Sequence, residues 1–359
     1  MISFKFEKES GLNLISQQSN LFHLLQKCPP LNFDEFLSQY QKIPPVQYAN
    51  SVDSSECILT VRVMAYNHVQ YLKECLDSIL NQQTSFRFQI MLMDDDSSDG
   101  TKELCLEYAQ THPDRIKLIL NSRANNIKIN GKPSGLFNSL FLNFTIKTKY
   151  LAIIEADDYW TDQSCLQKKV DILETHPSCS YCFSDGIRFE QESQKVLSSS
   201  MVKLKRSGVI NKEQAMDLTI PTASLVFRNM IEDNFHDEVL LIPNSDILLR
   251  AKLAHYGKGY FIRELKPVYR RVHLKGMYSG LNIDEKYEMM IKARKVVISF
   301  FEKKDWEVTF LHDNLCYIYV KRIRYNAKRL KPVLQTIFAL RQSSRKSSKS
   351  FSQNLFRSL

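Results

Sequence analysis

Three carboxylates follow one apolar stretch of this sequence at close spacing. Glu155, Asp157 and Asp158 come directly after 150–154, which has the length and β-branched content of a strand buried on both faces. Carboxylates crowded at the end of such a strand repel one another and lose solvation, so they need a cation or several hydrogen-bond donors. The pattern therefore predicts either a site for a hard divalent ion such as Mg²⁺ or Mn²⁺, or a solvated acidic turn.

A second group of acids stands at the end of another predicted strand. The apolar run 88–93 is followed by Asp94, Asp95 and Asp96, and then by the turn residues 97–100. The carboxyl ends of parallel strands meet at one edge of a sheet, so both acid groups are expected there. Their co-location favours the metal site over the solvated turn.

The elements that must position these acids alternate between strand and helix. Such an alternation is typical of an α/β fold with a doubly wound, mostly parallel sheet flanked by helices. Neither GxGxxG nor a P-loop pattern occurs, which disfavours a dinucleotide cofactor and a P-loop ATPase. The expected order is strand 57–64, a helix with an apolar stripe over 72–80, strand 88–93, helix 101–112, strand 116–120, a long polar loop 121–133, helix 135–147 and strand 150–154.

The composition is that of a globular protein able to bury a large core, with 359 residues of which 43% are hydrophobic. No run of eighteen apolar residues occurs, and charged residues between positions 5 and 9 replace the apolar core of a signal peptide. We therefore expect a cytoplasmic protein. Of the eight cysteines, only Cys179 and Cys182 have metal-ligand spacing, and their strand-like surroundings favour core packing over zinc binding.

The positive charge is concentrated at the C-terminus. Residues 321–359 hold eleven Lys and Arg and no Asp or Glu, whereas the whole chain carries +10, so the preceding residues are close to neutral. Basic residues are interspersed there with apolar ones such as Val333, Leu334, Ile337 and Phe338. This predicts peripheral binding to an anionic membrane surface, with a solvated Ser- and Lys-rich end as the alternative. Nucleic acid is disfavoured because stacking aromatics are sparse.

The patterns also divide the chain into segments. Apolar stripes at helical spacing occur over 33–40 and again over 285–301 and 306–323. The predicted segments are 1–56 as an N-terminal appended segment and linker, 57–280 as the catalytic domain, 281–326 as a C-terminal helical extension and 327–359 as the basic tail.

Three segments in register resemble a known family. AYNHVQYLKECLDSIL, DDDSSDGT and EADDYWTD, in this order and spacing, are similar to the family 2 glycosyltransferases of the GT-A fold, and the resemblance runs from about Cys57 to Ser279. It implies transfer of a sugar from a nucleotide-diphospho-sugar donor. Acceptors of this family include glycans and lipid-linked glycans, so cell-surface polysaccharide synthesis is the expected setting.

The resemblance also assigns residues on the donor side. Ala65 and Tyr66 would flank the nucleobase, and Asp95 would accept the base N–H. Glu155 takes the first position of the family's Asp-x-Asp motif, near the ribose, where this chain departs by having Glu. Asp157 takes the last position, which holds Mn²⁺ or Mg²⁺ on the diphosphate, and Asp158 is an additional or alternative ligand.

On the acceptor side, Asn244, Ser245 and Asp246 match the place where the family keeps an acid at the start of a helix. A carboxylate there stays ionised, so Asp246 is the expected general base, unless Asp246 or Ser245 merely caps the helix. The segment YRRVH makes His273 a second candidate contact for metal or diphosphate, or a packed histidine.

The resemblance implies an inverting transfer, in which the acceptor hydroxyl attacks the anomeric carbon opposite the leaving diphosphate. Two other functions compete with it. A nucleotidyltransferase would need a Gly-rich basic loop after the first strand, which AYNHVQY lacks. A catalytically silent glycan-binding protein would have little reason to retain Asp95, Asp157 and Asp246 together.

Overall fold

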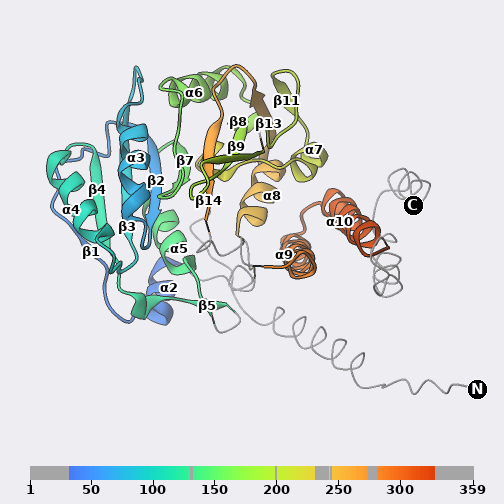
Figure 1. Cartoon of the computed structure of the whole chain (residues 1–359), viewed down its shortest axis with the longest axis horizontal. Coiled ribbons are helices and arrows are strands. Elements are labelled where there is room, and N and C mark those ends of the chain that lie inside the picture. The colour runs from blue at the N-terminus through green and yellow to red at the C-terminus, as the bar shows by residue number, and fades with distance from the viewer. Residues whose placement is uncertain are drawn as a thin grey trace, which may run out of the picture.

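A central sheet of nine strands runs through the part of the chain that the computed structural model describes (Figure 1). The described residues are 32–129, 132–198, 200–230, 242, 245–273 and 281–327. The sheet order is β1 (Val46–Gln47), β4 (Ile116–Leu120), β3 (Arg87–Asp94), β2 (Cys57–Ala65), β7 (Tyr150–Glu155), β12 (Val226–Arg228), β8 (Cys179–Ser184), β13 (Lys258–Ile262) and β11 (Gly208–Ile210).

Strands β4, β3, β2 and β7 are parallel, as the alternation predicted. In their register Ala65 lies opposite Asp94, and Met64 lies opposite Glu155. Both acid groups therefore start at the same level of the same carboxyl edge, which confirms their predicted co-location.

Beyond β7 the sheet is mixed. The short strand β12 lies antiparallel between β7 and β8, and β13 returns parallel to β8. A second sheet of three strands, in the order β10 (Lys195–Ser198), β9 (Gly186–Glu190) and β14 (Val268–Val272), stands beside the carboxyl edge. Tyr159, just after β7, forms an antiparallel bridge with Tyr269 of β14, which ties this sheet to the acid group of β7.

Helices cover both faces of the central sheet because its strands are apolar on both sides. In β7, Ala152 and Ile154 join one buried cluster, and Leu151 and Ile153 join the other. The first cluster is covered by α3 (Val69–Leu80), α4 (Thr101–Thr111) and α6 (Cys165–Thr175). The second is covered by α5 (Leu136–Thr145), α7 (Lys212–Asp217), α8 (Asp246–Tyr256), α9 (Ile283–Lys303) and α10 (Thr309–Ala327).

Residues 32–47 pack on this body rather than standing apart from it. Helix α2 (Phe33–Tyr40) starts at a capping box of Asn32 and Glu35. Its Phe36 is fully buried and stacks on Phe137 of α5, with ring centroids 5.3 Å apart. Strand β1 adds to β4. The boundary at residue 57 stays a prediction, and residues 1–31 and the basic tail from Lys328 lie outside the described residues.

The two predicted C-terminal helices are present as α9 and α10. A capping box of Asn282 and Glu285 starts α9. Phe300, Phe301 and Phe310 are buried in the same cluster as Leu151 of β7, so this extension packs against the sheet domain.

The long polar loop of the sequence contains some structure. It includes a 3₁₀ turn η1 (Arg123–Asn125) and the strand pair β5 (Lys128–Ile129) and β6 (Lys132–Pro133).

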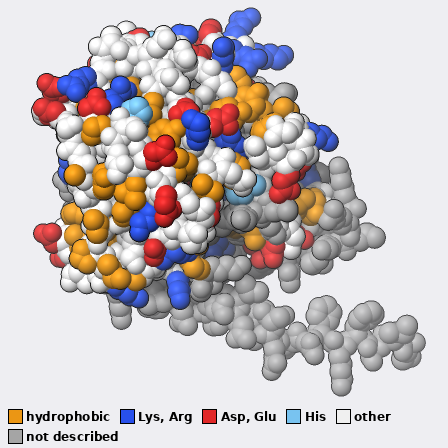
Figure 2. All heavy atoms as spheres, turned by 60° about the vertical axis from the view of Figure 1, so that its left-hand side comes forward, with side chains coloured by type: hydrophobic (Ala, Val, Ile, Leu, Met, Phe, Trp, Pro, Cys, Tyr) orange, Lys and Arg blue, Asp and Glu red, His pale blue; other side chains and the backbone are white. Residues whose placement is uncertain are grey.

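On the face shown in Figure 2, acidic and basic side chains of the described residues are interspersed. Within the described ranges, no helix combines the length and the apolar character needed to cross a membrane. Cys179 and Cys182 are both buried in β8.

Candidate active site

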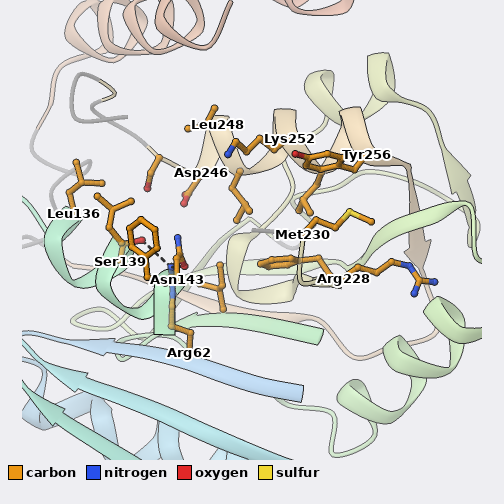
Figure 3. A pocket seen from close by; sticks show the side chains of 17 residues that line it. Arg62, Leu136, Ser139, Asn143, Arg228, Met230, Asp246, Leu248, Lys252 and Tyr256 are labelled. Atoms are coloured by element: carbon orange, nitrogen blue, oxygen red, sulfur yellow. Dashed lines mark hydrogen bonds between the residues drawn. The ribbon is translucent and has the colours of Figure 1, made fainter. Parts of the chain in front are cut away.

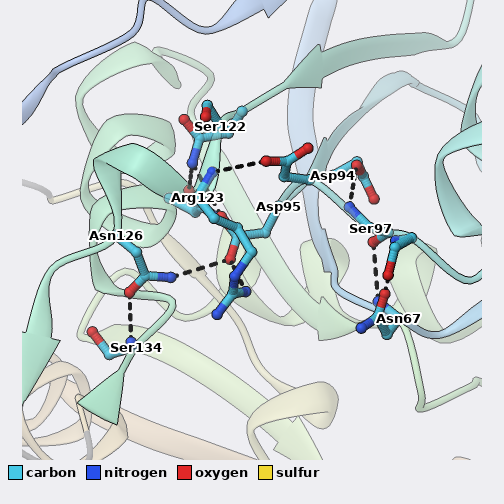
Figure 4. A network of polar contacts seen from close by, with 12 residues as sticks. Asn67, Asp94, Asp95, Ser97, Ser122, Arg123, Asn126 and Ser134 are labelled. Atoms are coloured by element: carbon cyan, nitrogen blue, oxygen red, sulfur yellow. Dashed lines mark hydrogen bonds and ion pairs between the residues drawn. The ribbon is translucent and has the colours of Figure 1, made fainter. Parts of the chain in front are cut away.

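The loop after β2 and the loop after β4 meet at Asp95. Arg123 Nη1 donates to Asp95 Oδ2 at 2.8 Å, and Asn121 Nδ2 donates to Oδ1 at 3.1 Å (Figure 4). The Arg123 guanidinium also lies over the exposed ring of Tyr66, 3.8 Å from its centroid. Burial raises the pKa of Asp95, although these hydrogen bonds and the charge of Arg123 oppose the rise. The structure thus brings together Tyr66 and Asp95, the two side chains that the resemblance places at the nucleobase.

Local turns fix the position of these groups. Asn67 has φ of 53° and Asp96 has φ of 59°, which short polar side chains tolerate better than most. Asn67 N donates to Ser97 Oγ at 3.0 Å, and Ser97 N donates to Asp94 Oδ2 at 3.1 Å (Figure 4). Gly100, with φ of 99°, then starts α4 in a conformation that glycine adopts at little cost.

Asp157 lies in a group with two histidines. His273 Nε2 and Asp157 Oδ2 are 3.0 Å apart, and one ligand atom from each of His68, Asp157 and His273 lies within 4.8 Å of the others. Burial raises the pKa of Asp157. The His273 hydrogen bond and the charges of His68 and His273 together lower this pKa by more than burial raises it, so the net shift is downward. Burial lowers the pKa of His68.

Two imidazoles and a carboxylate form a donor set that fits a divalent ion. His68 Nδ1 is buried and has no hydrogen-bond partner among the described residues. A bound cation would satisfy such a nitrogen, so the residues present fit the metal that the resemblance implies.

His273 directly follows strand β14 and contacts Asp157, and Asp158 forms a hydrogen bond with the main chain of that strand. Asp158 Oδ1 accepts from Arg271 N at 2.9 Å, and Arg271 Nη1 donates to the main-chain oxygen of Asp157 at 2.7 Å. Arg271 also pairs with Glu74 of α3. Burial, and then the charge of Asp157, raise the pKa of Asp158 well above its usual range. The structure therefore directs Asp158 Oδ1 to the main chain of β14 and not to the group of His68, Asp157 and His273.

Glu155 ends β7 on the face covered by α5 and α8. Burial raises its pKa to about 7, with Arg62 lowering it and Asp157 and Asp246 raising it. The carboxyl therefore changes charge near neutral pH. Its neighbours in this electrostatic group come from β2, from the turn after β7 and from the start of α8.

Asp246 is the first residue of α8, where helix N–H groups and the dipole favour a carboxylate. Ser245 precedes it as the N-cap residue and makes no side-chain cap hydrogen bond. Asp246 lines a pocket between α5 and α8 (Figure 3). Asn244, which the sequence grouped with these two, lies outside the described residues.

Sequence reasoning missed three side chains of this region. His68 stands in the connection after β2, and the edge rule that located the acids would also have located it. Arg123 lies in the polar loop 121–133, which has no periodic pattern that would single it out. Arg62 is a charge inside a β-branched strand, and that mismatch with a buried pattern was the available signal.

The sheet order and the position of the acids at its carboxyl edge are those of the GT-A fold. Residues 60–235 match the family model described as Glycosyl transferase family 2. Residues 60–235 therefore belong to this family.

Several curated proteins are similar over part of their length. The Mycobacterium tuberculosis protein Rv1520 is 27% identical over 228 residues, which cover 64% of this chain and 62% of that protein. The chain thus spans less than two thirds of this relative. The minor teichoic acid biosynthesis protein GgaB of Bacillus subtilis is 24% identical over 57% of this chain and 22% of its own length, and GgaA of the same organism is 27% identical over 32% and 25%.

Among solved structures, TarS 1-349 of S. aureus in complex with UDP-GlcNAc is similar in fold. It has a TM-score of 0.55 and 17% identity, and the match covers 82% of each chain. At this identity the likeness supports the fold, including the mostly parallel sheet flanked by helices.

Proposed function

We propose that this protein is an inverting, metal-dependent glycosyltransferase that transfers a sugar from a nucleotide-diphospho-sugar to a hydroxyl of a glycan or lipid-linked glycan. The observation that carries the proposal is the grouping of His68, Asp157 and His273 at the carboxyl edge that also holds Asp95. This arrangement supplies a cation site and a nucleobase contact on one edge, as a nucleoside diphosphate requires.

The described side chains divide the work between donor and acceptor. Tyr66 offers a ring face to the base, Ala65 lies beside it, and Asp95 accepts a base N–H once Arg123 has moved aside. Glu155 would contact the ribose, as the family resemblance implies. His68, Asp157 and His273 would hold the divalent ion, which when bound stabilises negative charge on the diphosphate as a Lewis acid.

Asp246 would remove the proton of the acceptor hydroxyl while the bond from oxygen to the anomeric carbon forms. The bond from that carbon to the diphosphate oxygen breaks on the opposite face, so the configuration inverts. A general base of this kind contributes about 10²-fold to 10⁴-fold to a rate. The position of Asp246 in a pocket at a helix N-terminus supports this role.

We place the reaction in cell-surface polysaccharide synthesis. Two similar Bacillus subtilis proteins take part, by their names, in minor teichoic acid biosynthesis, and the solved TarS binds UDP-GlcNAc. Because imidazole suits transition metals better than Mg²⁺, the two histidines favour Mn²⁺ as the ion.

The test is a thermal-unfolding screen of the full chain with UDP-, GDP- and dTDP-sugars, each with Mn²⁺, with Mg²⁺ and with chelator. We expect the nucleotide sugars of at least one nucleobase to raise the unfolding midpoint of the protein. Mn²⁺ should enlarge that rise more than Mg²⁺ does. Hydrolysis of the same donor provides a second readout. A chain that binds no nucleotide sugar under any of these conditions contradicts the proposed function.

Asp95→Ala should weaken nucleotide binding more than turnover at saturating donor, because the base loses its acceptor while the groups at Asp157 and Asp246 remain. Titration calorimetry with the free nucleoside diphosphate measures the affinity of variant and parent. Asp185→Ala is the matched control, since Asp185 is also a buried acid but accepts from main-chain Met201 and Val202. Equal affinities for Asp95→Ala and the parent would remove Asp95 from the base contact.

The basic tail is proposed to bind the inner face of the membrane peripherally. Each Lys or Arg near an anionic surface contributes up to about 1 kcal/mol. Because α10 continues to Ala327 and Asn326 is buried, the tail should be removed after Ala327. Co-sedimentation with anionic vesicles should fall on truncation and in high salt, whereas binding that survives both changes is incompatible with the idea.

A further inference from the structure

A pocket of about 120 Å³ lies between α5 and α8, against the sheet face formed by β2, β7 and β12 (Figure 3). Leu136, Leu140 and Phe144 of α5 and Leu248, Leu249 and Leu253 of α8 give it apolar walls. Pockets for whole ligands usually measure about 300–1,000 Å³, so this one has room for one group of a larger ligand. Asp246 is one of the residues that line this pocket, whereas Asp95 and Asp157 are not.

Arg62 of β2 lies at the sheet side of this pocket. The residue is only 6% exposed. Nη1 donates to Ser139 Oγ at 2.9 Å and to Asn143 Oδ1 at 2.8 Å, both on α5, and Figure 3 shows these groups across the pocket from Asp246 and Lys252. Nε is buried and has no hydrogen-bond partner among the described residues.

The partners of Arg62 are neutral. No carboxylate of the described residues forms an ion pair with it, although the charges of Glu155 and Asp246 reach it through space. A buried cation without a paired anion is strongly unfavourable unless something compensates it. A guanidinium that keeps a donor unused is a suitable binding group for a planar carboxylate or a phosphate.

The second arginine of the pocket differs from Arg62. Arg228 lines the pocket, but its guanidinium points away in Figure 3 and is used by main-chain oxygens. Its Nε donates to Cys179 O at 2.9 Å, and its Nη2 donates to Leu173 O. Arg228 thus has a structural role at the far end of the pocket. Arg62, by contrast, keeps one hydrogen-bond donor, Nε, unused among the described residues.

We propose that Arg62 forms an anion subsite for the acceptor, and that the natural acceptor carries a phosphate or carboxylate close to its reacting hydroxyl. The proposal rests on the proposed function, because Asp246 as the base places the acceptor in this pocket. Binding of the anion to Arg62 would orient the hydroxyl toward Asp246. Arg62 is therefore a positioning residue for the acceptor and not a catalytic residue.

Direct binding tests this subsite without any transfer. Titration calorimetry of the full chain in chelator, which prevents capture of anions by a metal, would use glycerol 3-phosphate and glucuronate, with glycerol and glucose as the matched neutral probes. We expect the parent to bind one of the two anions at least about tenfold more tightly than its neutral match. Phosphate and carboxylate acceptors are distinguished by which anion binds.

Arg62→Met should abolish this preference, and Arg62→Lys should weaken it about tenfold because the ammonium lacks the planar fork. Arg62→Met leaves Ser139 Oγ and Asn143 Oδ1 without their donor, so its thermal unfolding is measured alongside to establish that the variant is folded when the preference is assessed. Arg228→Met is the control, with lower stability but an unchanged preference for the anion. Equal anion binding by the parent and Arg62→Met, or none by the parent, overturns the subsite.

A second titration separates acceptor from donor. With Mn²⁺ and a saturating nucleotide sugar from the thermal screen whose sugar group is uncharged, the anionic probe should still bind. Displacement of the probe by that donor would assign the subsite to the donor sugar and overturn the acceptor assignment. Failure of the screen itself would reject the proposed function while leaving the chelator titration interpretable.

Discussion

Asp157→Ala is expected to abolish sugar transfer and the Mn²⁺-dependent part of nucleotide binding while leaving the fold intact. The substitution removes the carboxylate of the three-residue group and leaves two histidines, which are too few ligands to hold the ion on a diphosphate. It also relieves the repulsion that raises the pKa of Asp158. The stability of the metal-free protein should therefore change little. Thermal unfolding with nucleotide, with and without Mn²⁺, measures the binding loss independently of turnover.

The neighbouring acid supplies the control. Asp158→Asn keeps an oxygen that can accept from Arg271 N, so it should preserve the position of β14 and the Mn²⁺ response. If Asp158→Asn lost that response as completely as Asp157→Ala, Asp158 would have to be counted as a ligand. Near-normal turnover of Asp157→Ala with Mn²⁺ would reject the metal site altogether.

Asp246→Asn is expected to bind the donor as the parent does and to lose at least about 10²-fold in turnover, the lower range for removal of a general base. The amide has the size of the carboxylate but takes up no proton from the acceptor hydroxyl. The proposed donor contacts, Tyr66 and Asp95, lie on the loops after β2 and β3, whereas Asp246 begins α8, so donor affinity should be unaffected. Single-turnover rates at saturating donor, together with donor titration, separate the two quantities.

Ser245→Ala is the matched control for this helix N-terminus. Ser245 makes no side-chain cap hydrogen bond, so its loss should leave turnover within about twofold. A large turnover loss for Ser245→Ala would indicate that geometry of the helix start, and not proton transfer, explains the effect of Asp246→Asn. A loss of donor affinity with little change in turnover would move Asp246 to the donor side.

The parallel half of the fold was predictable because its signals are local. Strands such as β2 and β7 are long and apolar enough to recognise, and acids at their ends identify the carboxyl edge without any knowledge of long-range contacts. Strand β12 has three residues, which is too short for a periodicity, and its antiparallel insertion depends on the pairing of β7 with β8.

The site was predictable to the extent that it depends on that edge. The proximity of His273 and Asp157 depends on the return of β14 from more than a hundred residues away, fixed by the Tyr159–Tyr269 bridge. No spacing in the sequence encodes that contact. The partners of Asp95 likewise come from a polar loop whose conformation is set by side-chain hydrogen bonds rather than by a repeating pattern.

The packing of α9 and α10 extends the folding unit beyond the span that the family model matches. The family match ends at residue 235, yet Phe300, Phe301 and Phe310 are buried with Leu151 in one core. Exposing these three side chains would cost about 1.5–3 kcal/mol each, which together approaches the whole stability of a domain at about 5–15 kcal/mol. A chimera that exchanged only the matched span with a relative would join two surfaces that had not adapted to each other. The span that the family model matches is therefore shorter than the unit that packs around one core.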